Sequence, residues 1–255
     1  MLTEIHHGTP GTRPILIAHG LFGSARNWGV IAKRLAKTRH VVAVDMRNHG
    51  TSPRADRQDY PGMAADLAEV IEALGGEADV IGHSMGGKAA MMLALTRPER
   101  VARLLVADIA PVTYTHSHAP LIAAMRGLDL SRIDSRSAAD QALAASIDDP
   151  SLRAFLLQSL DLRGRKWRLN LEVLERDLPR ILGWPETDAQ FTGPTLFLAG
   201  DASNYVLAEH RAAIKRHFPT ARQAKLPGVG HWLHAEAPRA FEETARAFLG
   251  AEPIG

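Results

Sequence analysis

Residues 79–88, with the sequence Asp-Val-Ile-Gly-His-Ser-Met-Gly-Gly-Lys, constrain the fold of this chain more than any other stretch. The β-branched pair Val80-Ile81 predicts the end of a strand, and the apolar residues that follow the stretch recur at helical spacing. Between them lies a turn of the form Gly-x-Ser-x-Gly, centred on Ser84. We expect glycine at positions 82 and 86 because a turn this tight brings backbone against backbone and leaves no room for a Cβ atom.

Ser84 in such a turn is a candidate nucleophile. A serine hydroxyl is a poor nucleophile by itself, so it has to be exposed beside a base and near N–H groups that stabilise an oxyanion. A junction of strand, turn and helix meets these demands, because it presents the hydroxyl at a strand end and directs the positive end of the helix towards it. The five-residue pattern alone is weak evidence, but the flanking strand and helix are the context that this interpretation requires.

The chain as a whole alternates between strand and helix patterns. At 255 residues it is long enough for one large α/β domain or two small ones. Continuous apolar runs are typical of strands that are covered on both faces, so we expect an α/β fold with a mainly parallel sheet flanked by helices. Besides the elbow strand, the predicted strands are Pro14–Ala18, Val41–Asp45, Val101–Ala107, Pro194–Ala199 and Ala221–Leu226. Helical periodicity covers residues 63–74, 206–217 and 238–249.

The pattern changes between residues 112 and 191, where helical stretches occur without a convincing strand. Asp149 is an N-cap residue for a helix in which Leu152, Phe155 and Leu156 share a face. We expect residues 112–191 to form a helical cap inserted into a core domain of residues 1–111 and 192–255. The alternative is a pair of ordinary βα units with weak strands.

Composition limits the function classes. The formal net charge is only +2, and no basic run is long enough to indicate nucleic-acid binding. The absence of cysteine excludes disulfides and thiolate catalysis. No apolar run approaches the roughly 18 residues of a membrane span, and no basic region followed by an apolar core opens the chain. We therefore expect a cytoplasmic protein without a membrane span that binds a small molecule.

The general base should be a histidine beyond the nucleophile. His231 is distinctive among the twelve histidines, because it follows a strand end in a loop bracketed by glycine. Among the carboxylates between Ser84 and His231, only Asp108 and Asp201 directly follow strands, so either could orient the imidazole. Geometry does not choose between them.

Two backbone N–H groups are required to bind the oxyanion. One should belong to Met85, directly after the nucleophile, and the other to the loop that follows the first buried strand. In that loop we favour Leu21, with Phe22 as the alternative. The side chain of Phe22 is also a candidate substrate contact, because a backbone role leaves side chains free to line an acyl pocket.

These motifs together resemble the α/β-hydrolase superfamily and, more narrowly, the bacterial YbfF-type esterases, over about residues 14–248. The resemblance is carried by His19–Ser24, Asp45–Gly50, Gly82–Lys88, Asp108–Pro111, Gly183–Trp184 and Gly230–Glu236. It implies that Asp108 is the acid and that Ser203 hydrogen-bonds His231 as a fourth member. Asn204 departs from the proline that family members tend to have after this serine.

The activity implied is hydrolysis of an acyl ester or acyl thioester through an acyl-enzyme, with no metal and no organic cofactor. One alternative on the same fold is a C–C bond hydrolase or a lyase of the menaquinone-pathway type, which would need several arginines facing the site. Candidates for these are Arg126, Arg163, Arg165 and Arg168. A second alternative is a ligand receptor that has kept the fold and lost turnover.

Overall fold

The structure, a computed structural model, describes residues 1–11 and 13–250. Its main feature is a seven-stranded sheet with the strand order β1-β3-β2-β4-β5-β8-β9, in which every neighbouring pair is parallel except β1 and β3. This confirms the expected α/β fold with a mainly parallel sheet. The strands are β1 (Thr3–His7), β2 (Ile15–Ala18), β3 (Val41–Asp45), β4 (Ala78–His83), β5 (Val101–Ala107), β8 (Thr195–Gly200) and β9 (Arg222–Leu226).

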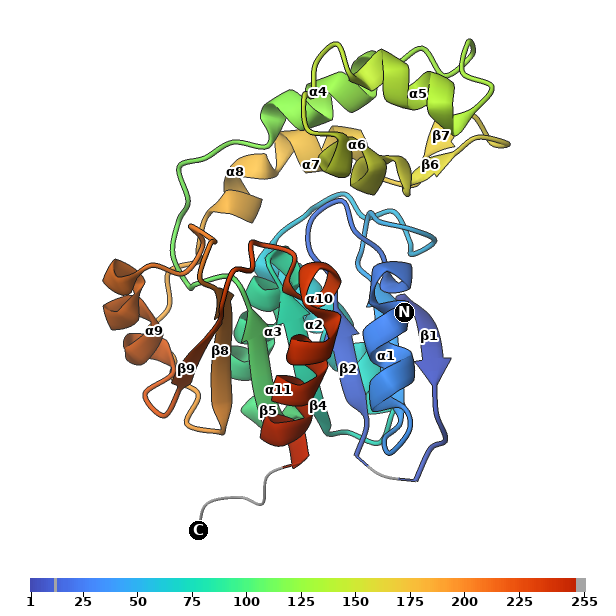
Figure 1. The fold of residues 1–255 in the computed structure, drawn as a ribbon. Coiled ribbons are helices and arrows are strands. Elements are labelled where there is room, and N and C mark those ends of the chain that lie inside the picture. The colour runs from blue at the N-terminus through green and yellow to red at the C-terminus, as the bar shows by residue number, and fades with distance from the viewer. Residues whose placement is uncertain (12, 251–255) are drawn as a thin grey trace.

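Apolar side chains leave both faces of this sheet, because successive residues of a strand point to opposite sides. In β2, Ile15 and Ile17 belong to one buried cluster, while Leu16 and Ala18 belong to the other. The first cluster packs against α1 (Gly29–Leu35) and α11 (Pro238–Gly250). The second packs against α2 (Tyr60–Ala73), α3 (Met85–Thr96) and α9 (Arg211–His217). Figure 1 shows these two helical layers on either side of the sheet.

The N-terminal strand β1 was not predicted. It pairs antiparallel with β3 at the edge of the sheet, with Ile5 opposite Ala43. Four of its five residues are polar, and all five are at least partly exposed, so they give neither an apolar run nor a clean alternation. An edge strand of this kind is held by backbone hydrogen bonds to its neighbour, which leave no pattern in the side chains.

A helical layer lies across the carboxyl edge of the sheet, in green and yellow in Figure 1, and is formed by the chain between β5 and β8. Its helices are α4 (Ala119–Gly127), α5 (Arg136–Leu143), α6 (Pro150–Leu157), α7 (Leu171–Arg176) and α8 (Leu178–Leu182). The side chain of Asp149 caps α6, as expected. The expectation of no strand in this region is wrong, because β6 (Leu160–Asp161) and β7 (Lys166–Trp167) form a two-stranded sheet. The division into a cap of residues 112–191 and a core stays a prediction.

The remaining short elements connect these layers. They are the 3-10 helices Ala25–Trp28, Pro98–Arg100 and Ala208–His210, and the one-turn helix α10 (Leu233–Glu236). In the part of the chain that the structure describes, no helix has both the length and the apolar character needed to cross a membrane.

The turn at Ser84 is as tight as its glycines predict. A Cβ atom on Gly82 would lie 2.4 Å from the carbonyl oxygen of Gly86. A Cβ atom on Gly86 would lie 2.4 Å from the carbonyl oxygen of Ala18. Both contacts are with backbone atoms, which cannot swing aside as a flexible side chain can. Helix α3 therefore reaches the ends of β2 and β4 only because these positions carry no side chain.

Replacing Gly86 by alanine should destabilise the protein by at least about 3 kcal/mol, because the backbone of β2 or α3 would have to move. The matched control is Gly29→Ala, since a Cβ atom there meets nothing within 4 Å and the residue already has helical dihedral angles. We expect the control to match the native chain or to gain up to about 1 kcal/mol. Urea unfolding of the three chains measures both effects. Equal stabilities would contradict the close approach of α3.

Candidate active site

Ser84, Asp108 and His231 come together at the carboxyl edge of the sheet. Ser84 and Asp108 directly follow the neighbouring strands β4 and β5, and His231 lies in the loop after β9. Ser84 and Asp108 have positive φ angles, 51° and 49°. Residues other than glycine rarely adopt a positive φ angle, because the Cβ atom crowds the backbone. Where they do, the residue is often at a functional site. Two such residues on adjacent strand ends make this edge the candidate functional one.

The carboxylate of Asp108 faces His231. Its Oδ2 atom lies 2.7 Å from His231 Nδ1, and its Oδ1 atom accepts a hydrogen bond from the N–H of Gly200 at 3.1 Å. Asp201, the other candidate acid, instead accepts a hydrogen bond from the N–H of Gly228 at 2.5 Å and so holds the turn before the histidine loop. The structure thus brings Asp108, and not Asp201, to the imidazole.

Ser203 hydrogen-bonds Asp108 rather than His231. Its hydroxyl donates a hydrogen bond to Asp108 Oδ2 and accepts one from the N–H of Tyr205 at 3.2 Å. The expectation that Ser203 hydrogen-bonds His231 is therefore wrong, because the hydroxyl meets the carboxylate oxygen that the imidazole also contacts. Ser203 supports His231 only through Asp108.

Tyr205 and His83 also hold His231, and neither contact was predicted from the sequence. The ring of Tyr205 stacks on the imidazole, with a centroid distance of 3.8 Å and an interplanar angle of 18°. His83 Nε2 donates a hydrogen bond to the backbone carbonyl of His231 at 2.9 Å. The position of Tyr205 in a loop directly after a strand was the only signal that could have indicated this contact.

The loop after β2 carries the candidate oxyanion donors. In the described part of the chain, the N–H groups of Leu21 and Met85 have no hydrogen-bond acceptor. The N–H of Phe22 is occupied, since it donates to His49 Nε2 at 3.2 Å. This geometry favours Leu21 over Phe22 as the second donor.

Two buried histidines fix this loop, and both must be neutral to do so. His49 Nδ1 lies 2.8 Å from the carbonyl oxygen of Arg47, while His19 Nε2 accepts a hydrogen bond from the N–H of Met46 at 2.9 Å. A ring nitrogen that accepts a hydrogen bond carries no proton. Burial, followed by the neighbouring His19, lowers the pKa of His49 to about 3. Burial also lowers the pKa of His19.

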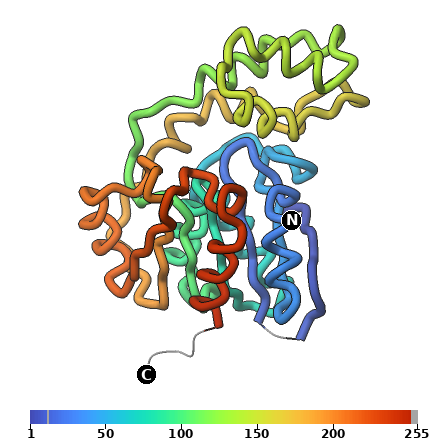
Figure 2. The backbone as a smooth tube through the Cα atoms, viewed as in Figure 1, coloured from blue at the N-terminus to red at the C-terminus, as the bar shows by residue number. Residues whose placement is uncertain are grey.

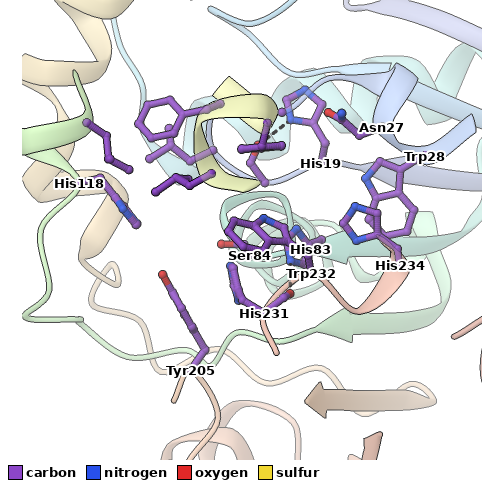
Figure 3. Close-up of a pocket in the computed structure, with 17 residues that line it drawn as sticks. His19, Asn27, Trp28, His83, Ser84, His118, Tyr205, His231, Trp232 and His234 are labelled. Carbon is purple, nitrogen blue, oxygen red and sulfur yellow. Dashed lines mark hydrogen bonds between the residues drawn. The ribbon is translucent and has the colours of Figure 1, made fainter. Parts of the chain in front are cut away.

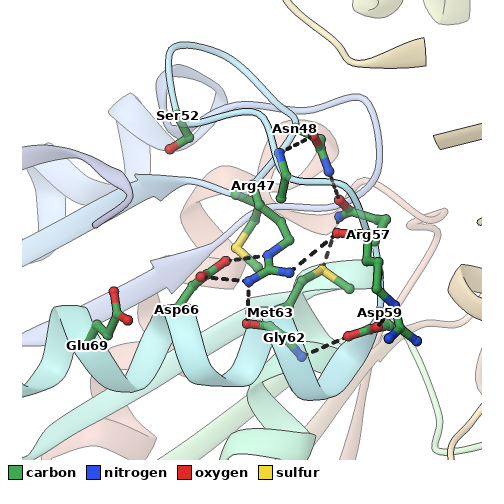
Figure 4. Close-up of polar contacts among 12 residues, drawn as sticks. Arg47, Asn48, Ser52, Arg57, Asp59, Gly62, Met63, Asp66 and Glu69 are labelled. Carbon is green, nitrogen blue, oxygen red and sulfur yellow. Dashed lines mark hydrogen bonds and ion pairs between the residues drawn. The ribbon is translucent and has the colours of Figure 1, made fainter. Parts of the chain in front are cut away.

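The segment that contains His49 joins three parts of the molecule. Arg47 forms two hydrogen bonds with Asp66 on α2, of 2.6 and 2.8 Å (Figure 4). Asn48 accepts a hydrogen bond from the N–H of Asn170 in the helical layer at 2.9 Å. Since His49 holds the N–H of Phe22, the motif Arg-Asn-His ties the loop after β2, which carries the candidate oxyanion donor Leu21, to both a core helix and the layer above.

A cavity of about 230 Å³ opens beside Ser84, and Figure 3 shows its lining. Ser84 and His231 form part of its wall, although no hydrogen bond joins them among the described residues. Such bonds are often long in free enzymes and shorten when substrate binds. Phe22 lines the cavity, as expected for a substrate contact. The lining residues not predicted as such include Leu121, Leu152 and Phe155 of the helical layer, together with His118, Tyr205 and Trp232.

Sequence comparisons show the family to which the chain belongs. Residues 15–244 match the alpha/beta hydrolase family, and the chain belongs to that family. It is 40% identical over 238 residues to the esterase YbfF of Escherichia coli, a match that covers 92% of each chain. It is 41% identical over 246 residues to the sn-1-specific diacylglycerol lipase ABHD11 of Mus musculus, which covers 92% of this chain and 80% of the lipase.

A solved structure gives the same result. The chain superposes on a marine microorganism esterase with a TM-score of 0.93 and 37% sequence identity, over 97% of this chain and 98% of the esterase. The resemblance to YbfF-type esterases is thus confirmed. The relatives identify the protein as an esterase or lipase of the alpha/beta hydrolase family, a hydrolase that acts on ester bonds.

The neutral buried histidines predict a loss of stability in acid. Burial lowers the pKa of both His49 and His234 to about 3, whereas the pKa of a histidine in the unfolded chain is about 6.5. The unfolded chain therefore takes up protons that the folded chain does not, and the free energy of unfolding should fall as the pH falls through this window. For His49 alone, we expect a loss of about 2 kcal/mol between about pH 7 and about pH 5.

Urea unfolding at these two pH values, on the native chain and on His49→Gln, measures this contribution. The variant keeps His234 but lacks His49, so its free energy of unfolding should vary by about 2 kcal/mol less over the same pH interval. An equal change in both chains would show that His49 is not held neutral by the fold.

Proposed function

We propose that the protein is a serine carboxylesterase that cleaves acyl esters or acyl thioesters through an acyl-enzyme. The observation that carries this proposal is the convergence of three groups on one cavity. These are the hydroxyl of Ser84, the imidazole of His231 with its Asp108 contact, and Leu21, whose N–H group is unoccupied. The second unoccupied N–H group belongs to Met85, the residue directly after Ser84. Acyl transfer requires a nucleophile, a base and an oxyanion site, and each has a candidate here.

In the proposed mechanism, His231 Nδ1 donates its hydrogen bond to Asp108, which leaves the lone pair of Nε2 free to accept the proton of Ser84. The serine oxygen attacks the ester carbonyl, and the N–H groups of Leu21 and Met85 stabilise the oxyanion. His231 then returns the proton to the leaving alcohol or thiol. Water repeats the sequence and releases the acid. Asp108 holds one tautomer of the imidazole, and Ser203 and Gly200 hold Asp108.

The proposed acyl site is the apolar part of the cavity. Leu121, Leu152 and Phe155 approach it from the helical layer, and Phe22 and Trp232 approach it from the core. Residues 112–191 act as the cap in this proposal, over a core of residues 1–111 and 192–255. The names of the relatives, an esterase and a diacylglycerol lipase, support an uncharged acyl substrate.

The proposed lyase or C–C bond hydrolase alternative receives less support from the cavity. A substrate with several carboxylates would require cationic side chains near the nucleophile. Among the described residues that line the cavity, none is an arginine or a lysine. Arg126, one of the candidate arginines, pairs with Glu175 on the outer part of the helical layer.

The first test is hydrolysis of nitrophenyl esters of increasing acyl length, from acetyl to decanoyl, by the native chain and by Ser84→Ala. We expect kcat/KM to fall at least about a thousandfold in the variant, because no other group can form the acyl-enzyme. The acyl length with the highest kcat/KM indicates the length of the acyl site. Turnover that survives the substitution, or none in the native chain at any length, would favour the lyase or receptor alternatives.

The second test separates the two candidate acids. Asp108→Asn should lower kcat by about a factor of 10⁴, because an amide cannot hold the tautomer that the mechanism needs. Asp201→Asn serves as the matched control, since it changes a strand-end aspartate whose carboxylate contacts Gly228. We expect the control to retain kcat within about threefold. The reverse order of the two losses would reassign the acid to Asp201.

A further inference from the structure

Lys88 has no role in the mechanism above, yet it is almost fully buried one helical turn after Ser84. Only 1% of the residue is exposed, and its backbone N–H donates a hydrogen bond to the carbonyl oxygen of Ser84. Its ammonium group donates to three backbone carbonyls. These are the carbonyls of Val112 at 2.7 Å, Leu182 at 2.9 Å and Gly183 at 2.7 Å. An ammonium group has three N–H donors, so all of them are used.

The three carbonyls belong to the two segments that connect the helical layer to the core, one between β5 and α4 and the other from the end of α8 to β8. These segments are the first crossing and the return crossing. Val112 lies at the start of the first crossing, and Leu182 and Gly183 lie at the start of the return. Figure 2 shows both crossings on the same side of the molecule. The N–H of Tyr114 donates to the carbonyl of Leu182 at 3.0 Å, which confirms that the crossings lie side by side. Lys88 therefore joins both ends of the layer to the helix that carries the nucleophile.

This arrangement is costly for a lysine. In the described part of the chain no carboxylate forms an ion pair with Lys88, and burial lowers its pKa to about 7. The ionisable groups around it come from α2 and from the first crossing: Tyr60, Tyr114 and His116. Carbonyl dipoles and the faces of the two tyrosine rings thus replace water. A methionine of similar length would avoid the desolvation but could not bind the three carbonyls.

We propose that Lys88 is a positioning residue that fixes the helical layer over Ser84 and thereby sets the selectivity for acyl length. Leu121, Leu152 and Phe155 of the layer form part of the apolar wall, and the side chain of Lys88 joins both ends of that layer to α3. If this junction loosens, the wall moves relative to the nucleophile while the machinery on the strand ends stays in place. The selectivity part of this inference rests on the proposed esterase function.

Hydrogen exchange tests the junction without reference to activity. In Lys88→Met, the amide of Tyr114 should exchange at least about tenfold faster than in the native chain, because its acceptor carbonyl loses the ammonium that holds it. The amide of Asn170, which binds the core at Asn48, is the internal reference and should change less. Lys37→Met is the matched control, since Lys37 is exposed. Unchanged exchange at Tyr114 would overturn the proposal.

Ester hydrolysis tests the selectivity. In Lys88→Met, the ratio of kcat/KM for the octanoyl ester to that for the acetyl ester should fall at least about fivefold, with the larger change in KM. A purely structural role would lower kcat/KM for both esters by the same factor. That result would contradict the proposal. If the methionine variant does not fold, Lys88→Gln keeps part of the hydrogen bonding and should show the same effects to a smaller degree.

The two proposals fail in different ways. If the native chain hydrolyses no ester, the esterase proposal fails, while the exchange of Tyr114 still decides whether Lys88 holds the crossings. If the native chain is active and Lys88→Met keeps both the native exchange and the native selectivity, the proposal for Lys88 fails and the esterase proposal stands.

Discussion

The approach of helix α3 to the ends of β2 and β4 is the contact on which the rest of the site depends. The carbonyl oxygens of Ala18 and Gly86 lie 2.4 Å from the positions that Cβ atoms on residues 86 and 82 would occupy. This closeness holds Ser84 in a left-handed conformation at the end of β4 and aims the first N–H groups of the helix at the same point. The parallel sheet then supplies the other groups, because all of its parallel strands end at this one edge.

Four polar side chains near Ser84, those of Asp108, His231, His19 and His49, are held by hydrogen bonds within the fold. Asp108 receives hydrogen bonds from three directions, and His231 is held by its contacts with Asp108, Tyr205 and His83. His19 and His49 stay neutral and accept hydrogen bonds from backbone N–H groups, so they can fix the loop after β2 without adding charge. Groups that do not have to reorganise when charge develops are the ones that lower a barrier most.

Sequence reasoning was most successful where chemistry and backbone geometry share one pattern. The buried strands are apolar runs, and the turn at Ser84 and the histidine loop place glycine next to the end of a strand. It could not choose between Asp108 and Asp201, because both follow strands and the direction of a side chain depends on φ, which is 49° at Asp108. It assigned the wrong partner to Ser203 and did not find the stacking of Tyr205, since such contacts join loops far apart in the chain. The polar edge strand β1 was missed because backbone pairing leaves no mark on side chains.

The insertion of the helical layer between β5 and β8 separates two kinds of evolutionary change. The groups proposed for bond cleavage lie on strand ends and loops of the core, whereas three apolar residues of the cavity wall lie between the two crossings. In the proposed esterase, substitutions at Leu121, Leu152 or Phe155 can therefore reshape the substrate range without disturbing Ser84. A lineage with this architecture can acquire new substrates by drift in one contiguous stretch of its gene, while the reaction itself is inherited unchanged.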